Sequence, residues 1–236
     1  MNHAVTKAFF RLFQLSFFLV ASAGAQAGIQ EAHDAYLNKD FPAALKEFKP
    51  LADGGDAKAQ FYIGLMYDNG EGVSQDYQQA ITWYRKAADQ GYAPAESNLG
   101  VIYEMAGRVE RNYKEAASWY RRAADQGDAA AQFNLGLMNY VGRGDDFPRN
   151  YGEAALWYGK AAEQGNVAAQ NSLGRMYENG QGLTTNYVEA YKWYALAEEA
   201  GNESAQQNRD AIEKKITPEQ ILEAQALAKE WRAKHK

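Results

Sequence analysis

The sequence has no cysteine among its 236 residues, and this absence excludes several classes of protein. Disulfide-stabilised scaffolds, zinc or iron–sulfur sites held by thiolates, and cysteine nucleophiles are all ruled out. Histidine is also scarce: His3, His33 and His235 lie near the two ends of the chain, so they would have to converge from distant positions to form a cluster. We therefore expect no catalytic site, no metal site and no cofactor.

Basic residues are outnumbered by acidic ones. The chain has 25 Lys and Arg against 30 Asp and Glu, a net charge of −5, and an isoelectric point near 5.4. This is the wrong sign of charge for neutralising phosphates, so we expect no nucleic-acid partner. At 46%, hydrophobic residues are too frequent for a disordered chain. These values indicate a folded, acidic protein.

The first 27 residues have the layout of a secretory signal peptide. Two basic residues precede an apolar stretch over 12–20, and a run of small residues follows it. Cleavage after Ala27 fits best, with Ala25 as the other candidate. Because the apolar stretch is shorter than the ~20 residues of a membrane-spanning helix, we expect no stable membrane insertion after cleavage. The protein is predicted to be periplasmic or secreted; an uncleaved membrane anchor is the alternative.

Glycine and tryptophan recur with a fixed period. One glycine series has intervals of 36, 36 and 38 residues, and the tryptophans have intervals of 36, 38 and 36. The two series are Gly64, Gly100, Gly136 and Gly174, and Trp83, Trp119, Trp157 and Trp193. A period in this range is typical of a solenoid of two-helix repeats. The sequence therefore predicts four complete repeats, at 59–94, 95–130, 131–168 and 169–204.

The sequence of each repeat predicts two helices joined by a short link. Ala59, Ile63, Met66 and Tyr67 form one apolar stripe of a first helix in the first repeat. The second helix starts after an Asp or Asn that is followed three residues later by Gln or Glu, the form of a capping box. An Ala-x-x-Trp-Tyr motif follows, and a glycine in a left-handed conformation ends the helix. Short links favour antiparallel helix pairs.

The repeated aromatic residues and glycines are interpreted as packing residues. A glycine inside a helix costs ~1 kcal/mol relative to alanine, so its recurrence suggests the close approach of a neighbouring backbone. The tryptophans are expected to be buried between helices; a sugar-binding aromatic cluster is the alternative.

Both ends of the repeat array are predicted to be caps. Residues 28–58 form a shorter helical pair without tryptophan, in which Ala44 and Phe48 keep the repeat phase. Residues 205–236 form two capping helices, the second opened by a capping box at 217–220 with Pro218 at its first position.

At these motifs the chain resembles the Sel-one-like repeat family, a relative of the tetratricopeptide repeats. The matching stretches are Ile63-Gly64-Leu65-Met66-Tyr67, Leu99-Gly100-Val101-Ile102-Tyr103 and Leu173-Gly174-Arg175-Met176-Tyr177. The resemblance implies an all-α, right-handed superhelical α-solenoid of antiparallel helix pairs that acts as an adaptor without catalysis. It also implies functions of exported bacterial members, which include envelope assembly, exopolysaccharide regulation and host interaction.

Two repeats depart from the pattern. In the second repeat, 105–108 replaces the Asn-Gly-x-Gly turn, so this turn must differ. The third repeat has Asn139 where the others have tyrosine, and its loop at 142–148 is two residues longer and contains Arg143-Gly144-Asp145. A host-receptor tripeptide is one interpretation of that loop, and ordinary loop variation is the other.

The face of the first helices opposite the buried stripe lines the concave surface in this family, and we expect a protein or peptide partner to bind there. The candidate residues are Phe61, Leu65, Asp68, Val101, Glu104, Phe133, Leu137, Tyr140, Arg175 and Glu178. The alternative is that the apolar members pack against the adjacent first helix.

The favoured function is therefore an exported, non-enzymatic scaffold for protein–protein interaction. The alternative is a glycan-binding or hydrolytic envelope protein that uses neighbouring acids such as Asp145 and Asp146, or Glu198 and Glu199.

Overall fold

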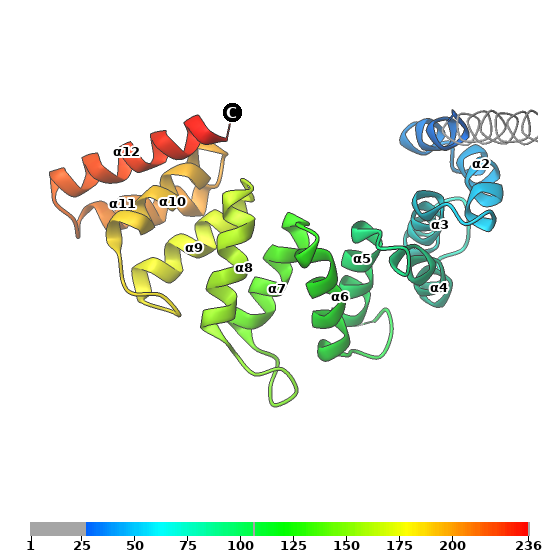
Figure 1. Cartoon of the computed structure of the whole chain (residues 1–236), viewed down its shortest axis with the longest axis horizontal. Coiled ribbons are helices and arrows are strands. Elements are labelled where there is room, and N and C mark those ends of the chain that lie inside the picture. Colours follow the sequence, from blue (N-terminus) through cyan, green and yellow to red (C-terminus); the bar gives the residue numbers. More distant parts are fainter. Residues whose placement is uncertain (1–26, 106, 236) are drawn as a thin grey trace, which may run out of the picture. The chain divides into compact units, whose positions relative to one another are not determined.

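The computed structural model describes residues 27–105 and 107–235, and all regular secondary structure in these ranges is helical (Figure 1). A first helix spans 27–37. The helices that follow are α2 (Phe41–Asp53), α3 (Ala57–Asn69), α4 (Tyr77–Ala88), α5 (Ala93–Glu104), α6 (Tyr113–Asp125), α7 (Ala129–Val141), α8 (Tyr151–Glu163), α9 (Val167–Asn179), α10 (Tyr187–Glu199), α11 (Glu203–Glu213) and α12 (Pro218–Lys234). They pack in consecutive pairs, so the predicted all-α repeat architecture is confirmed.

The chain divides into two compact parts, Met1–Asn98 and Leu99–Lys236. In the N-terminal part, α2 packs on α3 and α3 packs on α4. Their core contains Ala44 and Phe48, which are fully buried, together with Ile63 and Met66. The apolar stripe predicted for the first repeat therefore faces this core.

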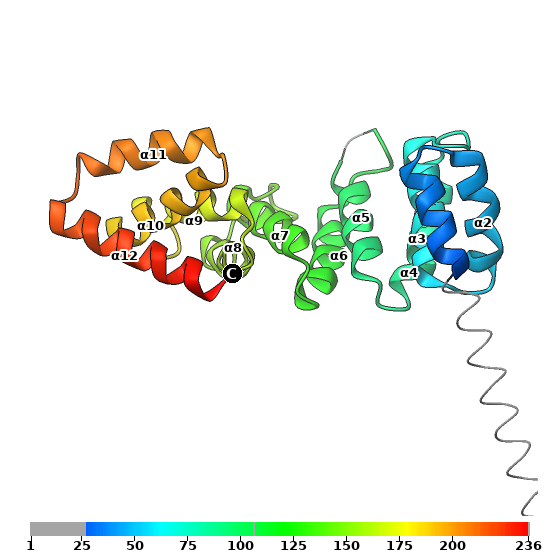
Figure 2. The same ribbon diagram turned by 90° about the horizontal axis from the view of Figure 1, so that it is seen from above.

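In the C-terminal part, each helix from α6 to α10 packs against the next one along the chain. Helix α10 also contacts both α11 and α12, so the last helix returns alongside α10 (Figure 2). The capping box predicted at the start of α12 is present: Thr217 and Gln220 each bond the other's backbone N–H. Trp231 near its end lies edge-on to Trp193, with the ring centroids 6.3 Å apart.

The second helices begin at the predicted Asx caps. The side chains of Asp76, Asn112, Asn150 and Asn186 each accept a backbone N–H from the first turn. At two of these caps the glutamate at the third position bonds an indole. Trp119 Nε1 donates to Glu115 and Trp157 Nε1 donates to Glu153, at 2.9 and 3.0 Å. A hydrogen bond to Trp157 and a second one to Arg121 lower the pKa of Glu153, so it stays ionised.

The four tryptophans are buried, as predicted, and are between 2% and 9% exposed. The alanines that precede them by three residues are fully buried. The rings of Trp83, Trp119, Trp157 and Trp193 therefore stabilise the packing of helices and are not available to stack on a sugar.

The helical glycines have a different reason from the expected one. A Cβ atom added at Gly64, Gly100, Gly136 or Gly174 would lie 2.6–2.7 Å from a ring carbon of the tyrosine in the second helix of the same repeat. That tyrosine directly follows the repeated tryptophan, and its ring lies against the glycine. The expectation of a close backbone neighbour was therefore wrong at Gly64, Gly100 and Gly136, where a tyrosine side chain needs the space. At Gly174 the backbone oxygen of Ala190 is also close, 3.2 Å from the added Cβ atom.

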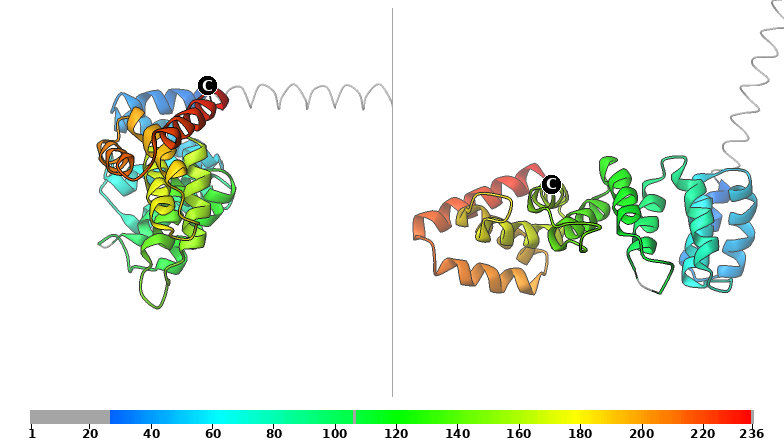
Figure 3. Two further views of the ribbon diagram at one scale, coloured as in Figure 1. Left: turned by 90° about the vertical axis from the view of Figure 1, so that its left-hand side faces the viewer. Right: turned by 90° about the horizontal axis from the view of Figure 1, so that it is seen from below.

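The two irregular repeats differ locally, as predicted. Helix α5 has 12 residues where α3, α7 and α9 have 13, so it ends one residue early. Asn139 is buried and donates to the Leu135 carbonyl oxygen at 2.8 Å. The long loop that follows α7 projects from the C-terminal part between α7 and α8 (Figures 1 and 3).

The predicted signal peptide at 1–27 falls almost entirely outside the described residues. Among the helices that the structure describes, none has both the length and the apolar character needed to span a bilayer.

Candidate functional site

The ten candidate partner-binding residues divide between the two parts of the chain. Three lie in the N-terminal part. Asp68 is 6% exposed and accepts a hydrogen bond from the Tyr84 hydroxyl at 3.4 Å. Phe61 is half-buried, with its ring centroid 5.8 Å from that of Tyr84, and Leu65 is also half-buried. Asp68 therefore faces the interior of the repeat, and the two apolar side chains offer a partly exposed surface.

The other seven lie in the C-terminal part. Arg175 is exposed, and the remaining six are half-buried: Val101, Glu104, Phe133, Leu137, Tyr140 and Glu178. Phe133 packs on Tyr158, with the ring centroids 5.6 Å apart, and the same hydrophobic cluster is contacted by Leu137 and Tyr140. Each apolar member thus packs against the core with part of its side chain and leaves the rest exposed at the surface.

The two acids of this group are engaged within the chain. Tyr120 donates to Glu104 at 3.1 Å and Tyr194 donates to Glu178 at 2.8 Å. Each acid also pairs with a base: Glu104 with Arg143, and Glu178 with Lys215, both at 2.8 Å. Burial, reinforced by the neighbouring carboxylate, raises the pKa of Tyr120 and Tyr194, so both hydroxyls stay protonated as donors.

A tyrosine–acid hydrogen bond is therefore a repeated feature of the first, second and fourth repeats. The acid stands at the same position of each first helix: Asp68, Glu104 and Glu178. In the third repeat this position is Tyr140. Burial raises the pKa of the corresponding tyrosine, Tyr158, whose ring lines the same cavity as the Ser172 side chain.

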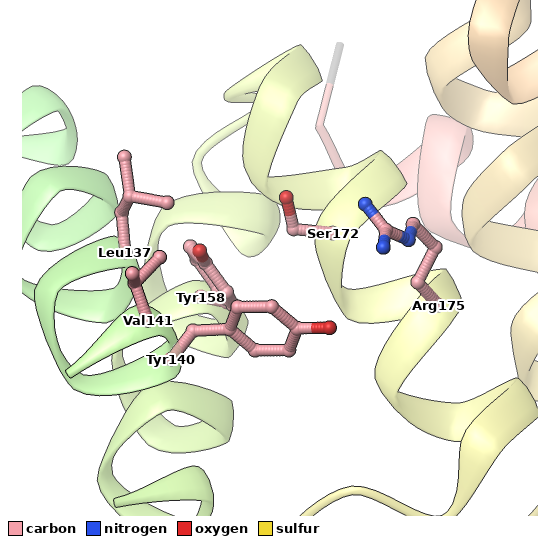
Figure 4. Close-up of a pocket in the computed structure, with 6 residues that line it drawn as sticks. All are labelled: Leu137, Tyr140, Val141, Tyr158, Ser172 and Arg175. Atoms are coloured by element: carbon pink, nitrogen blue, oxygen red, sulfur yellow. The ribbon is translucent and has the colours of Figure 1, made fainter. Parts of the chain in front are cut away.

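A cavity lies beside Tyr140 and Tyr158. A space of about 260 Å³ lies between α7 and α9 above the buried ring of Tyr158, and is lined by Leu137, Tyr140, Val141, Tyr158, Ser172 and Arg175. Leu137, Tyr140 and Val141 come from α7, and Ser172 and Arg175 come from α9 (Figure 4). Three of these six residues were in the predicted set: Leu137, Tyr140 and Arg175.

Arg175 is the one charged side chain in the lining, and it has no carboxylate within ion-pair distance in the described part of the chain. Figure 4 shows its guanidinium pointing across the cavity toward the side chains of α7. The Tyr140 hydroxyl donates to Gln181 at 3.0 Å, beside the cavity. The site therefore combines apolar and aromatic walls with a guanidinium whose donors are available to a ligand.

Val141, Tyr158 and Ser172 were missed by the sequence reasoning. The signal for Tyr158 was indirect: Tyr140 stands where the other repeats have an acid, and that acid is the partner of the tyrosine equivalent to Tyr158. Ser172 and Val141 carried no comparable signal, since they become lining residues only through the packing of α7 and α9.

The acid pairs proposed as a hydrolytic alternative do not form a carboxylate site. Glu198 pairs with Arg209 and Glu199 pairs with Arg232. Asp146 lies 3.5 Å from Lys114 on an exposed loop. Within 27–105 and 107–235, no group of three or more His, Cys, Asp or Glu side chains is placed to hold a metal ion. Neighbouring acids that point to different bases cannot share a substrate.

Two similar solved structures are more than 30% identical to this chain. A protective antigen with an SLR fold from uropathogenic Escherichia coli strains is 40% identical, with a TM-score of 0.73; the match covers 82% of this chain and 41% of that chain. The chain thus spans about two fifths of that antigen. A Sel1 repeat protein from Oxalobacter formigenes is 34% identical, with a TM-score of 0.71, covering 77% of this chain and 74% of that one.

A third structure shares the fold alone. A putative sel1 repeat protein from Klebsiella pneumoniae subsp. pneumoniae is 21% identical, with a TM-score of 0.53, covering 82% of this chain and 95% of that one. Comparison with curated proteins found no match.

The family model described as the Sel1 repeat matches residues 57–92, 93–128, 129–166 and 167–202. Each match begins two residues before the repeat counted from the glycines and tryptophans, at the residue where α3, α5, α7 or α9 begins. The matches cover more than half of the chain and all eight helices of the repeats. The chain therefore belongs to the Sel1 repeat family.

Proposed function

We propose that the protein is an exported, non-enzymatic scaffold that holds a segment of a partner protein on the exposed face of its first helices. The single observation that carries this proposal is the cavity between α7 and α9, where apolar, aromatic and cationic side chains meet at the surface of a repeat scaffold. Concave sites with apolar walls and a few convergent polar groups are the usual form of binding sites. Export rests on the signal-peptide layout of residues 1–27.

The name of one similar structure calls that protein a protective antigen of a pathogenic strain, which fits a protein exposed outside the cytoplasm. Because this chain spans 41% of that antigen, envelope assembly, exopolysaccharide regulation and host interaction all stay within the proposal.

Affinity capture from envelope extracts tests the proposal, with the mature chain from residue 28 as bait. Two matched variants locate the binding surface. Val141→Gln changes an apolar side chain at the cavity, 40% exposed, and Leu156→Gln changes one on α8, 49% exposed. We expect one partner to be retained by the unchanged chain and by Leu156→Gln, and to be lost from Val141→Gln. Equal retention by all three would reject this surface, and no reproducible partner would reject the scaffold function.

Export is tested separately. The full chain should be processed, and N-terminal sequencing of the product should begin at Gly28 or, for the other cleavage site, at Gln26. An unprocessed protein found with the cytoplasmic fraction would contradict this part of the proposal.

A further inference from the structure

Two departures from the repeat pattern face the same cavity. The first is Tyr140, at the position that holds Asp68, Glu104 and Glu178 in the other repeats. An acid there accepts a hydrogen bond from the buried tyrosine of its own repeat. The third repeat has no such acid, so the space beside Tyr158 contains no carboxylate, and the lining of the cavity carries none.

The second departure is Arg175. Its position in the repeat is the residue after the helical glycine, and the equivalent residues are Leu65, Val101 and Leu137. An aliphatic side chain stands there in three repeats and a guanidinium in the fourth. The acid that is missing from α7 and the cation that is added on α9 therefore lie at one site, although they are 35 positions apart in the sequence.

The guanidinium of Arg175 is available to pair with a carboxylate from outside the chain. Arg143, Arg209 and Arg232 each pair with a glutamate of the chain, whereas Arg175 is exposed beside apolar walls with no partner in the described residues. A guanidinium presents a planar fork of donors that matches a carboxylate in a bidentate arrangement. Low local polarity from Leu137, Val141 and the tyrosine rings strengthens such a pair.

The size of the cavity limits the ligand. At about 260 Å³ it is smaller than the roughly 300–1,000 Å³ typical of sites for drug-sized molecules, and it is open to the surface rather than enclosed. It accommodates an anionic side chain and part of an apolar neighbour, not a whole cofactor. Charge and size together favour a segment of protein over a small molecule.

We infer that this cavity binds an aspartate or glutamate side chain, flanked by an apolar residue, from an extended segment of the partner protein. The carboxylate takes the place of the acid that the other repeats carry, with Arg175 as its cation, and the apolar neighbour contacts Leu137 and Val141. This inference rests on the proposed scaffold function and adds the chemistry of the bound segment.

Selection from a random library of peptides with acetylated N-termini and amidated C-termini tests the inference. The mature chain is the bait, and blocked ends ensure that side chains are the sole source of carboxylates. We expect enrichment of Asp or Glu next to Leu, Ile, Val or Phe. Fluorescence anisotropy with the selected peptides should then show at least tenfold weaker binding to Arg175→Gln, and Arg175→Glu should select basic peptides instead.

Two further variants make the result specific. Lys229→Glu reverses the charge of an exposed residue on α12, outside the cavity, and should bind like the unchanged chain. Tyr140→Glu restores the acid found in the second and fourth repeats. It should pair internally with Arg175 and abolish binding while the helical circular dichroism is retained.

The possible outcomes separate the two proposals. If no peptide is selected, both the scaffold function and the inference fail. If peptides are selected without acidic enrichment, or if Arg175→Gln binds them unchanged, the scaffold function stands and the inference is overturned.

Discussion

The third and fourth repeats share the same apolar packing but differ in the polar residues beside it. In both, the ring of a buried tyrosine, Tyr158 or Tyr194, lies against a glycine of the preceding helix. In the fourth repeat the hydroxyl of that tyrosine donates to an acid, Glu178, which in turn pairs with Lys215. In the third repeat no carboxylate lies at that position, and Tyr158 lines a cavity together with Ser172. The apolar framework is therefore constant, while the polar groups above it vary and can carry function.

The largest expected effect tests the apolar packing that the two repeats share. Gly136→Ala places a Cβ atom 2.6 Å from the ring of Tyr158, so ring or helix must move. Overpacking typically costs ~1–3 kcal/mol, and the gain in helix propensity returns up to ~1 kcal/mol. We expect a net loss of about 1–2 kcal/mol in the free energy of unfolding, measured by urea denaturation monitored by circular dichroism.

Gly159→Ala is the matched control, because a Cβ atom there meets nothing within 4 Å. This glycine is also helical, in α8, so the substitution should stabilise the chain by about 0.5–1 kcal/mol through helix propensity alone. If both substitutions stabilised the chain equally, the tyrosine rings would not be the reason for the repeated glycines.

Much of the fold was readable from the sequence because a repeat displays its helix boundaries and buried positions several times. The Asx caps, the left-handed glycines and the buried tryptophans follow from local backbone and packing rules, and the structure confirms them. Positive φ angles at Gly91, Gly127 and Gly165 are examples. Periodicity therefore determines which residues are buried and where helices begin and end.

The polar contacts were not readable in the same way. Periodicity places Tyr158 in the core, but it does not say which atom its hydroxyl meets, because that partner lies on another helix. The expectation that a backbone approaches the helical glycines failed at three of the four for this reason, and Asp68 lies inside its repeat although its helix position suggested the surface. Contacts of this kind depend on the geometry between helices, which one repeat motif does not encode.

An intermediate effect tests the polar residues in which the third and fourth repeats differ. Tyr194→Phe removes a hydrogen bond to the ionised Glu178, whose side chain is 17% exposed. Hydrogen bonds to charged groups contribute ~1.5–3 kcal/mol, and the remaining pair with Lys215 offsets part of the loss. We expect a decrease of about 1–2 kcal/mol in the free energy of unfolding. Tyr158→Phe removes a hydroxyl that lines the cavity and meets no acid, so it should cost less, under about 0.5 kcal/mol. Equal losses would show that the acid adds nothing to the fourth repeat.

The smallest effect concerns the loop that distinguishes the third repeat. Its Arg143 pairs with Glu104 at 2.8 Å, and their side chains are 26% and 18% exposed, whereas Asp146 meets Lys114 at 3.5 Å with side chains 84% and 71% exposed. Surface pairs contribute little, while a partly buried arginine also gains from the ring of Tyr113, 5.5 Å away. Arg143→Ala should cost about 0.5–1 kcal/mol, and Asp146→Ala less than about 0.3 kcal/mol, in urea denaturation.

This last comparison also bears on the Arg-Gly-Asp tripeptide. A receptor that used Arg143 would first have to separate it from Glu104, so its binding would compete with a contact that holds the loop on the second repeat. Hydrogen exchange of the loop amides measures that contact directly: Arg143→Ala should speed exchange at 143–147, and Asp146→Ala should leave it unchanged. Unaltered exchange in both variants would mean that the contact between Arg143 and Glu104 does not hold the loop. Arg143 would then be available to a receptor without the loss of a stabilising contact.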